Sequence, residues 1–121
     1  MLESYNDLER DVAIEIMGFS QYRVPYGNKA YVLEGHIDKW VESPRYLESL
    51  DDAVEVSQVI IERSEGRITG SHLELPCKLN NYKYCFKYIF KGGAHVAFEC
   101  DDPCEAVCNL SLYVCRNVLR E

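Results

Sequence analysis

Every even-numbered residue from 82 to 90 is aromatic, and this alternation constrains the fold more than any other feature of the chain. In a β-strand successive side chains point to opposite faces, so a period of two places all these rings on one side. Gly92 and Gly93 supply a turn, and residues 94–100 can return as the partner strand. The sequence therefore predicts an antiparallel hairpin over residues 82–100.

The register of this hairpin follows from which face carries the apolar side chains. A loop of the two glycines alone would place Phe86 opposite Glu99 and mix charged with apolar groups on both faces. A three-residue loop that begins at Lys91 pairs Phe86 with Phe98 and gathers the apolar groups on one face. Because a slip of one residue would turn every side chain to the wrong face, the pattern selects the longer loop. We expect a type I turn with Gly93 in the left-handed conformation.

Three segments have the periodicity of amphipathic helices: residues 7–17, 50–63 and 103–118. Ser49 and Asp102 precede the second and third segments and are suitable N-caps, because their side-chain oxygens can accept hydrogen bonds from the first free amides. For the second helix we expect the buried face to consist of Leu50, Ala53, Val54, Ile60 and Ile61.

The remaining segments are shorter. Residues 24–28 are typical of a turn, residues 30–33 predict a short strand, and residues 67–75 predict a longer one. Residues 36–44 have no regular pattern and end in a proline, so we expect a loop there. A loop of this length inside a small domain is often functional.

These elements define the fold class. We expect one domain over residues 1–121 with an α+β fold: an antiparallel sheet of about three to four strands, including the 82–100 hairpin, packed with three helices as an α/β sandwich.

Charge and hydropathy restrict the partners. The net charge is −7, from 13 basic and 20 acidic side chains, which disfavours a nucleic-acid partner. The chain has no run of 18 apolar residues, and its first seven residues lack the basic and apolar pattern of a signal peptide. We therefore expect no membrane partner and a cytoplasmic location.

Six cysteines lie in the second half of the chain, and Cys100, Cys104 and Cys108 follow one another every four residues. That spacing suits one stripe of a helix, whereas structural zinc sites prefer pairs of cysteines two residues apart. Since cytosolic thiols stay reduced, we expect free cysteines that pack as small apolar side chains, and no metal site.

Catalytic patterns are weak. The sequence has no phosphate-binding glycine loop, no nucleophile elbow and no metalloprotease motif. A thiol–imidazole pair of Cys85 with His95 would lie on a flat sheet surface, and a solvated histidine explains His95 better. The adjacent carboxylates at residues 51–52 and 101–102 precede helices, where capping explains them. We therefore expect no catalytic residue, no cofactor and no enzyme.

Trp40, Arg45 and Tyr46 are the candidate ligand-binding residues. An aromatic pair with an arginine between can stack on a planar ring and clamp a phosphate. The alternative is that Trp40 and Tyr46 close the edge of the core while Arg45 is solvated.

Three stretches resemble one family. Residues 46–54 (YLESLDDAV) resemble the Tyr-x-x-Ser-Leu-Asp-x-Ala-aliphatic run of small bacteriophage proteins with the phage ABA (α-β-α) sandwich domain. Residues 102–108 (DPCEAVC) are similar to that family's Thr-Pro-x-x-Ala-aliphatic-Cys helix start, with Asp102 in place of Thr. Residues 8–19 resemble its first helix, with Phe19 in place of a Trp. The resemblance implies an α/β sandwich and a phage or prophage origin, and it implies no reaction.

Our expectation for function is a small, non-enzymatic phage accessory protein in the bacterial host cytoplasm. It would bind a host protein or a small molecule, such as a nucleotide immune messenger that it sequesters. The alternative is a structural or assembly accessory that forms a homo-oligomer through an edge of the hairpin.

Overall fold

The computed structural model describes residues 5–25, 29–34 and 38–119. In chain order the elements are α1 (Tyr5–Asp11), the π-helical turn η1 (Val12–Ile16), β1 (Tyr22–Arg23), β2 (Tyr31–Glu34), β3 (Lys39–Glu42), α2 (Leu50–Arg63), β4 (Ile68–Glu74), the 3₁₀ turn η2 (Lys78–Asn80), β5 (Tyr84–Phe90), β6 (His95–Cys100), α3 (Pro103–Val114) and the π-helical turn η3 (Cys115–Leu119).

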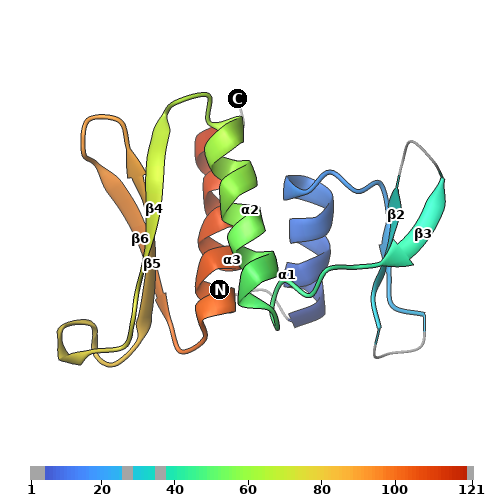
Figure 1. Cartoon of the computed structure of the whole chain (residues 1–121), viewed down its shortest axis with the longest axis horizontal. Coiled ribbons are helices and arrows are strands. Elements are labelled where there is room, and N and C mark those ends of the chain that lie inside the picture. The colour runs from blue at the N-terminus through green and yellow to red at the C-terminus, as the bar shows by residue number, and fades with distance from the viewer. Residues whose placement is uncertain (1–4, 26–28, 35–37, 120–121) are drawn as a thin grey trace.

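The helices lie between two antiparallel sheets. Sheet β4–β5–β6 is at one end of the molecule with α2 and α3 against it, α1 follows, and sheet β1–β2–β3 closes the other end (Figure 1). The predicted α+β fold, with three helices packed on antiparallel strands, is confirmed; the strands form two three-stranded sheets. Within the described residues no helix is both long and apolar enough to cross a membrane.

The aromatic hairpin has the predicted register. Phe86 pairs with Phe98 and Tyr88 with Val96, and these side chains face the helices. Gly93 has the positive φ that we expected, 97°, but the predicted type I turn is wrong. Gly92, the third residue of the turn that begins at Phe90, has a φ of 99°, whereas a type I turn needs a negative φ there. The hairpin therefore turns through a type II geometry, which requires a glycine at this position.

Both predicted caps are present. The Ser49 hydroxyl accepts from the amide of Asp52 at 3.3 Å, and the Asp102 carboxylate accepts from the amide of Glu105 at 3.0 Å. The predicted buried face of α2 was partly wrong, because Leu50 and Val54 are each 41% exposed. The helix instead turns a neighbouring stripe to the core, made of Ala53, Val56, Ser57 and Ile60.

Strand β3 replaces most of the loop that we expected in this region. Residues 39–42 pair antiparallel with β2, with Val41 opposite Val32 and Trp40 opposite Leu33. Four residues are too few to show a clear alternation in the sequence, and the strand exists because β2 supplies its hydrogen-bonding partner. Residues 36 and 37 of the expected loop lie outside the described part.

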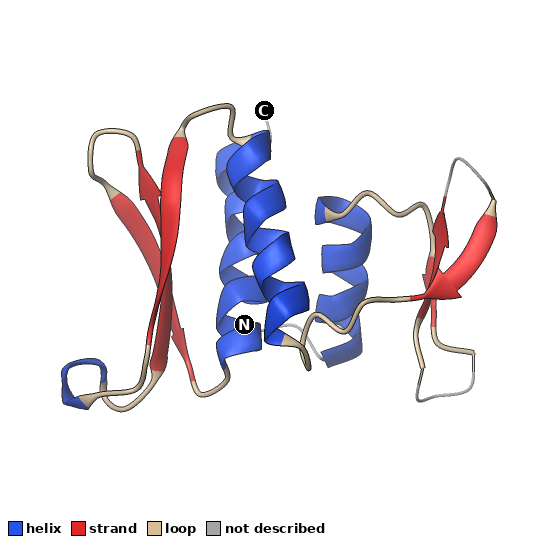
Figure 2. Ribbon diagram, viewed as in Figure 1, coloured by secondary structure: helices blue, strands red, loops and turns tan. Residues whose placement is uncertain are grey.

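All three helices run in the same direction, as the colour gradient of Figure 1 shows, so their carboxyl ends lie at the same end of the helical layer (Figure 2). Arg63 from the end of α2 donates to the carbonyls of Glu15 at 2.9 Å and Ile16 at 3.1 Å. Arg67 donates to the carbonyls of Ser64 at 3.1 Å and Val118 at 3.3 Å. These cations satisfy carbonyls that have no partner inside their own helices, at the negative ends of three helix dipoles.

Three of the cysteines pack in the core. Cys104, Cys108 and Cys115 are buried on α3 and η3, at 5%, 0% and 3% exposure. Burial raises the pKa of the Cys104 thiol to about 11, and it also raises the pKa of Cys108. The Cys104 and Cys108 thiols therefore remain protonated at neutral pH, and all three cysteines pack as apolar groups.

Candidate functional site

The outer face of the small sheet carries the candidate site. Tyr22, Val32 and Val41 are aligned across the three strands and pack toward α1 and the core, where Val32 is fully buried. Because side chains alternate along a strand, Arg23 and Trp40 lie on the opposite, outer face. This face is on the far side of the sheet from the helices.

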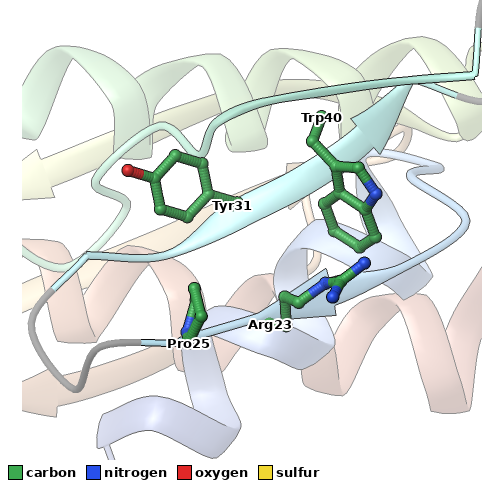
Figure 3. Close-up of a pocket in the computed structure, with 4 residues that line it drawn as sticks. All are labelled: Arg23, Pro25, Tyr31 and Trp40. Carbon is green, nitrogen blue, oxygen red and sulfur yellow. The ribbon is translucent and has the colours of Figure 1, made fainter.

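Arg23 and Trp40 stack on one another. The guanidinium carbon of Arg23 lies 3.8 Å from the centroid of the Trp40 ring, which is a close cation–π contact (Figure 3). Tyr31 and Pro25 complete the lining of an open cavity of about 310 Å³. Pairing across the sheet creates this arrangement, since Arg23 is opposite Tyr31 and β3 brings Trp40 alongside.

Arg23 differs from the other arginines that the structure describes. Each of the others donates to a carboxylate or to a backbone carbonyl: Arg10, Arg45, Arg63, Arg67 and Arg116. For Arg23, the described residues provide the Trp40 ring as a partner and neither an ion pair nor a hydrogen bond. The Trp40 indole therefore holds the planar guanidinium of Arg23 in place, and the N–H donors of this group are available to a ligand.

The lining residues define the chemistry of the cavity. They offer two aromatic rings, one cation and a proline, and no carboxylate, imidazole or thiol is among them. Aromatic faces stack on planar ligands, and a guanidinium binds carboxylate or phosphate oxygens in pairs. The arrangement therefore suits binding of a planar anion.

The structure does not bring the three predicted site residues together. Trp40 lines the cavity, but Arg45 is exposed and pairs with Glu48 at 3.1 Å. The Tyr46 ring is fully buried, and burial raises the pKa of its hydroxyl. Both residues lie outside the cavity lining.

Sequence reasoning missed Arg23, Pro25 and Tyr31. The turn predicted at residues 24–28 could have indicated them, because a hairpin around this turn would place Arg23 close to Tyr31. Strand β1 has only two residues, so no periodic pattern marked it.

The thiol–imidazole pair considered on the large sheet is not formed. Cys85 is opposite Glu99, whereas His95 is opposite Ile89, so the two side chains are separated by roughly 13 Å along the strands. Cys85 is buried and its pKa is raised by that burial, which leaves the thiol protonated. In the described chain no group of three or more potential ligand side chains is placed to hold a metal ion.

Comparisons with family models, with curated proteins and with solved structures found no match to this chain. The resemblance to the phage ABA sandwich domain therefore stays a prediction.

Proposed function

We propose that this chain is a non-enzymatic binding protein and that its outer sheet face, formed by Arg23, Pro25, Tyr31 and Trp40, binds an organic anion with a planar ring. The observation that carries this proposal is Arg23, whose guanidinium is held over an indole and makes no ion pair with a described residue of an acidic chain. A free cation beside two aromatic rings offers both a charge and a stacking surface.

A nucleotide fits this chemistry best. Its base can stack on Trp40 or Tyr31, and each stacked base contributes roughly 1–3 kcal/mol in single-stranded nucleic-acid complexes. Its phosphate can accept two parallel hydrogen bonds from Arg23. The cavity of about 310 Å³ is at the lower end of the size of small-molecule sites, so a mononucleotide or part of a larger nucleotide would fill it.

The biological setting is part of the same proposal. The resemblance of the sequence to phage proteins supports a phage or prophage accessory protein that acts in the host cytoplasm. A small binding protein without catalytic groups can remove a messenger nucleotide by sequestering it. The alternative is a structural accessory that forms a homo-oligomer through an edge of the hairpin. It is supported by the position of β6 at an edge of the large sheet.

Trp40 is the only tryptophan of the chain, so its fluorescence reports this cavity directly. The experiment is a titration of the protein with mononucleotides, cyclic mononucleotides and cyclic dinucleotides. We expect a saturable change in emission with at least one of them. Arg23→Gln should weaken the binding by about 10- to 100-fold, which corresponds to the loss of one charge-assisted contact.

Arg45→Gln is the matched control, because Arg45 is an exposed arginine outside the cavity lining. It should leave the affinity unchanged. Equal binding of a nucleotide and of its nucleoside without phosphate would contradict the role of Arg23. Emission that no nucleotide changes in a saturable way would reject the ligand class.

A further inference from the structure

The connection between β4 and β5 presents an apolar tip to solvent. This loop, residues 75–83, projects beyond the end of the large sheet and away from the helices (Figure 1). Leu79 is 98% exposed, and Leu75 and Tyr82 are each 69% exposed. A cluster of large apolar side chains on one loop is a feature of interaction surfaces.

The loop is held in place by its own hydrogen bonds. The buried side chain of Asn80 accepts from the Cys77 amide at 2.8 Å and donates to the Leu75 carbonyl at 3.1 Å. The Tyr82 amide donates to the Cys77 carbonyl at 2.7 Å. Leu79 therefore points outward from a defined loop.

The backbone of the loop is strained. Asn81 and Tyr82 both have positive φ angles, of 58° and 60°. Asparagine adopts this conformation readily, but it is unfavourable for tyrosine. The loop thus maintains an unfavourable conformation while it exposes three apolar side chains.

The charge of the loop is opposite to that of the whole chain. Residues 75–83 contain Lys78 and Lys83 and no acidic residue, whereas the chain as a whole has a net charge of −7. Both lysines are exposed, and no described carboxylate forms an ion pair with either of them. The loop is an apolar surface with basic margins, so it fits an apolar surface with acidic margins.

The outer face of α2 has this complementary character. Leu50 and Val54 are each 41% exposed and form one ridge, because they are four residues apart on the helix. The next ridge carries the exposed carboxylates of Asp51, Glu55 and Glu62. The described part of the chain supplies no ion-pair partner for these three carboxylates.

We propose that the 75–83 loop of one copy docks on the outer face of α2 of a second copy. The loop points away from its own helices, so this contact has to form between molecules (Figure 1). Leu75, Leu79 and Tyr82 would cover Leu50 and Val54 of the neighbour, while the lysines pair with its carboxylates. The two surfaces are different, so the assembly is head-to-tail, and each copy contacts two neighbours in a ring or an open chain.

The test is sedimentation equilibrium of the full chain over a range of concentrations. The wild-type protein should show a mass above that of one chain that rises with concentration. Lys78→Glu/Lys83→Glu reverses the charge of the loop, and Glu55→Lys/Glu62→Lys reverses that of the helix face. Each variant alone should associate at least about ten-fold more weakly, because its loop and face then carry charges of the same sign.

An equal mixture of the two variants should assemble again, because an acidic loop then meets a basic face and a basic loop meets an acidic face. Association that returns on mixing requires that these two surfaces touch each other. Two variants that had only failed to fold would not associate when they are mixed. Lys39→Glu/Lys91→Glu, which changes two exposed lysines outside the loop, is the matched control and should associate as the wild type does.

Leu79→Ser provides a second route, because a side chain that is 98% exposed can be changed without loss of core packing. It should also weaken association. A wild-type protein that stays monomeric at all concentrations would overturn the proposal. Assembly that persists in Lys78→Glu/Lys83→Glu and in Leu79→Ser would overturn it too and would point to the β6 edge. Binding of the monomeric wild type to phosphatidylcholine vesicles, lost in Leu79→Ser, would identify a lipid surface as the occupant instead.

Discussion

The hydroxyl groups of Tyr88 and Ser111 lie 2.6 Å apart in the core and join β5 to α3. Both side chains are fully buried. Tyr46 is equally buried, yet among the described residues its hydroxyl has no hydrogen-bond partner. The two tyrosines thus form a natural comparison between a satisfied and an unsatisfied polar group in one core.

Ser111→Ala should lower the free energy of unfolding by about 1–3 kcal/mol, because it leaves the buried Tyr88 hydroxyl without its partner. Urea denaturation followed by circular dichroism measures the change. In the double variant Ser111→Ala/Tyr88→Phe, the free energy of unfolding should fall by less than the sum of the decreases in the two single variants. The reason is that Tyr88→Phe removes the hydroxyl that Ser111→Ala leaves without a partner. Simple additivity would show that the two hydroxyls do not interact.

Tyr46→Phe should act in the opposite direction. It removes a hydroxyl that is buried without a described partner, so the free energy of unfolding should stay the same or rise by about 1 kcal/mol. The same denaturation experiment, with Tyr88→Phe as the comparison, measures this difference. If Tyr46→Phe lowers the free energy of unfolding by more than about 1 kcal/mol, the Tyr46 hydroxyl has a hydrogen-bond partner.

The thiols should differ strongly in reactivity. Cys77 is exposed on the 75–83 loop, whereas Cys108 is fully buried and Cys104 has a pKa raised to about 11 by burial. Because the thiolate is the reactive species, iodoacetamide at pH 8 should modify Cys77 rapidly and the buried thiols only after unfolding. Intact-mass measurements follow the reaction, and Cys77→Ser should remove the fast step. One equivalent of zinc that is lost in Cys104→Ser would contradict the absence of a metal site predicted from the sequence.

The Glu74–Lys87 ion pair predicts that the stability of the folded protein depends on pH. The Lys87 ammonium lies 2.5 Å from the Glu74 carboxylate and lowers its pKa through a hydrogen bond and through its charge. A carboxylate with a lowered pKa in the folded state stabilises the protein above its ordinary pKa, and this stabilisation is lost as the pH falls through the lower value. Glu74→Gln should therefore lower the melting temperature at pH 7, and the difference should shrink as the pH falls through the lowered pKa of Glu74. Thermal melts of both proteins across this range, at low salt, give the comparison. A difference that is independent of pH would assign the effect of the substitution to packing.

The sequence predicts some elements of this fold far better than others. The register of the β5–β6 hairpin was predictable because only one alignment separates its rings from its lysines. The buried face of α2 was not, because Leu50 and Val54 are apolar but lie on the exposed side, whereas the polar Ser57 is buried and donates to the Val54 carbonyl at 2.6 Å. Apolar residues outnumber the positions available in the core at this helix, so composition alone cannot identify the buried stripe.

The candidate site shows that the sequence also does not reveal which residues distant along the chain come together. Trp40 was predictable as a candidate for ligand binding because it is an isolated tryptophan in a stretch without helical periodicity. Its neighbours in the sequence, Arg45 and Tyr46, were natural partners by proximity. The structure instead places Arg23 and Tyr31 beside it, through strands of two and four residues. Such short strands carry too few residues for a period of two to be recognised.

The contacts of Arg116 have a consequence for how the chain is made. This arginine binds Asp11 at 2.9 Å across 105 positions in the sequence, and it also binds Glu15. During synthesis α1 leaves the ribosome about 105 residues before Arg116 in η3, which supplies its cation. The apolar stripe of α1 and η1 therefore stays partly uncovered until α3 and η3 have also left the ribosome, and only then can the core close around it.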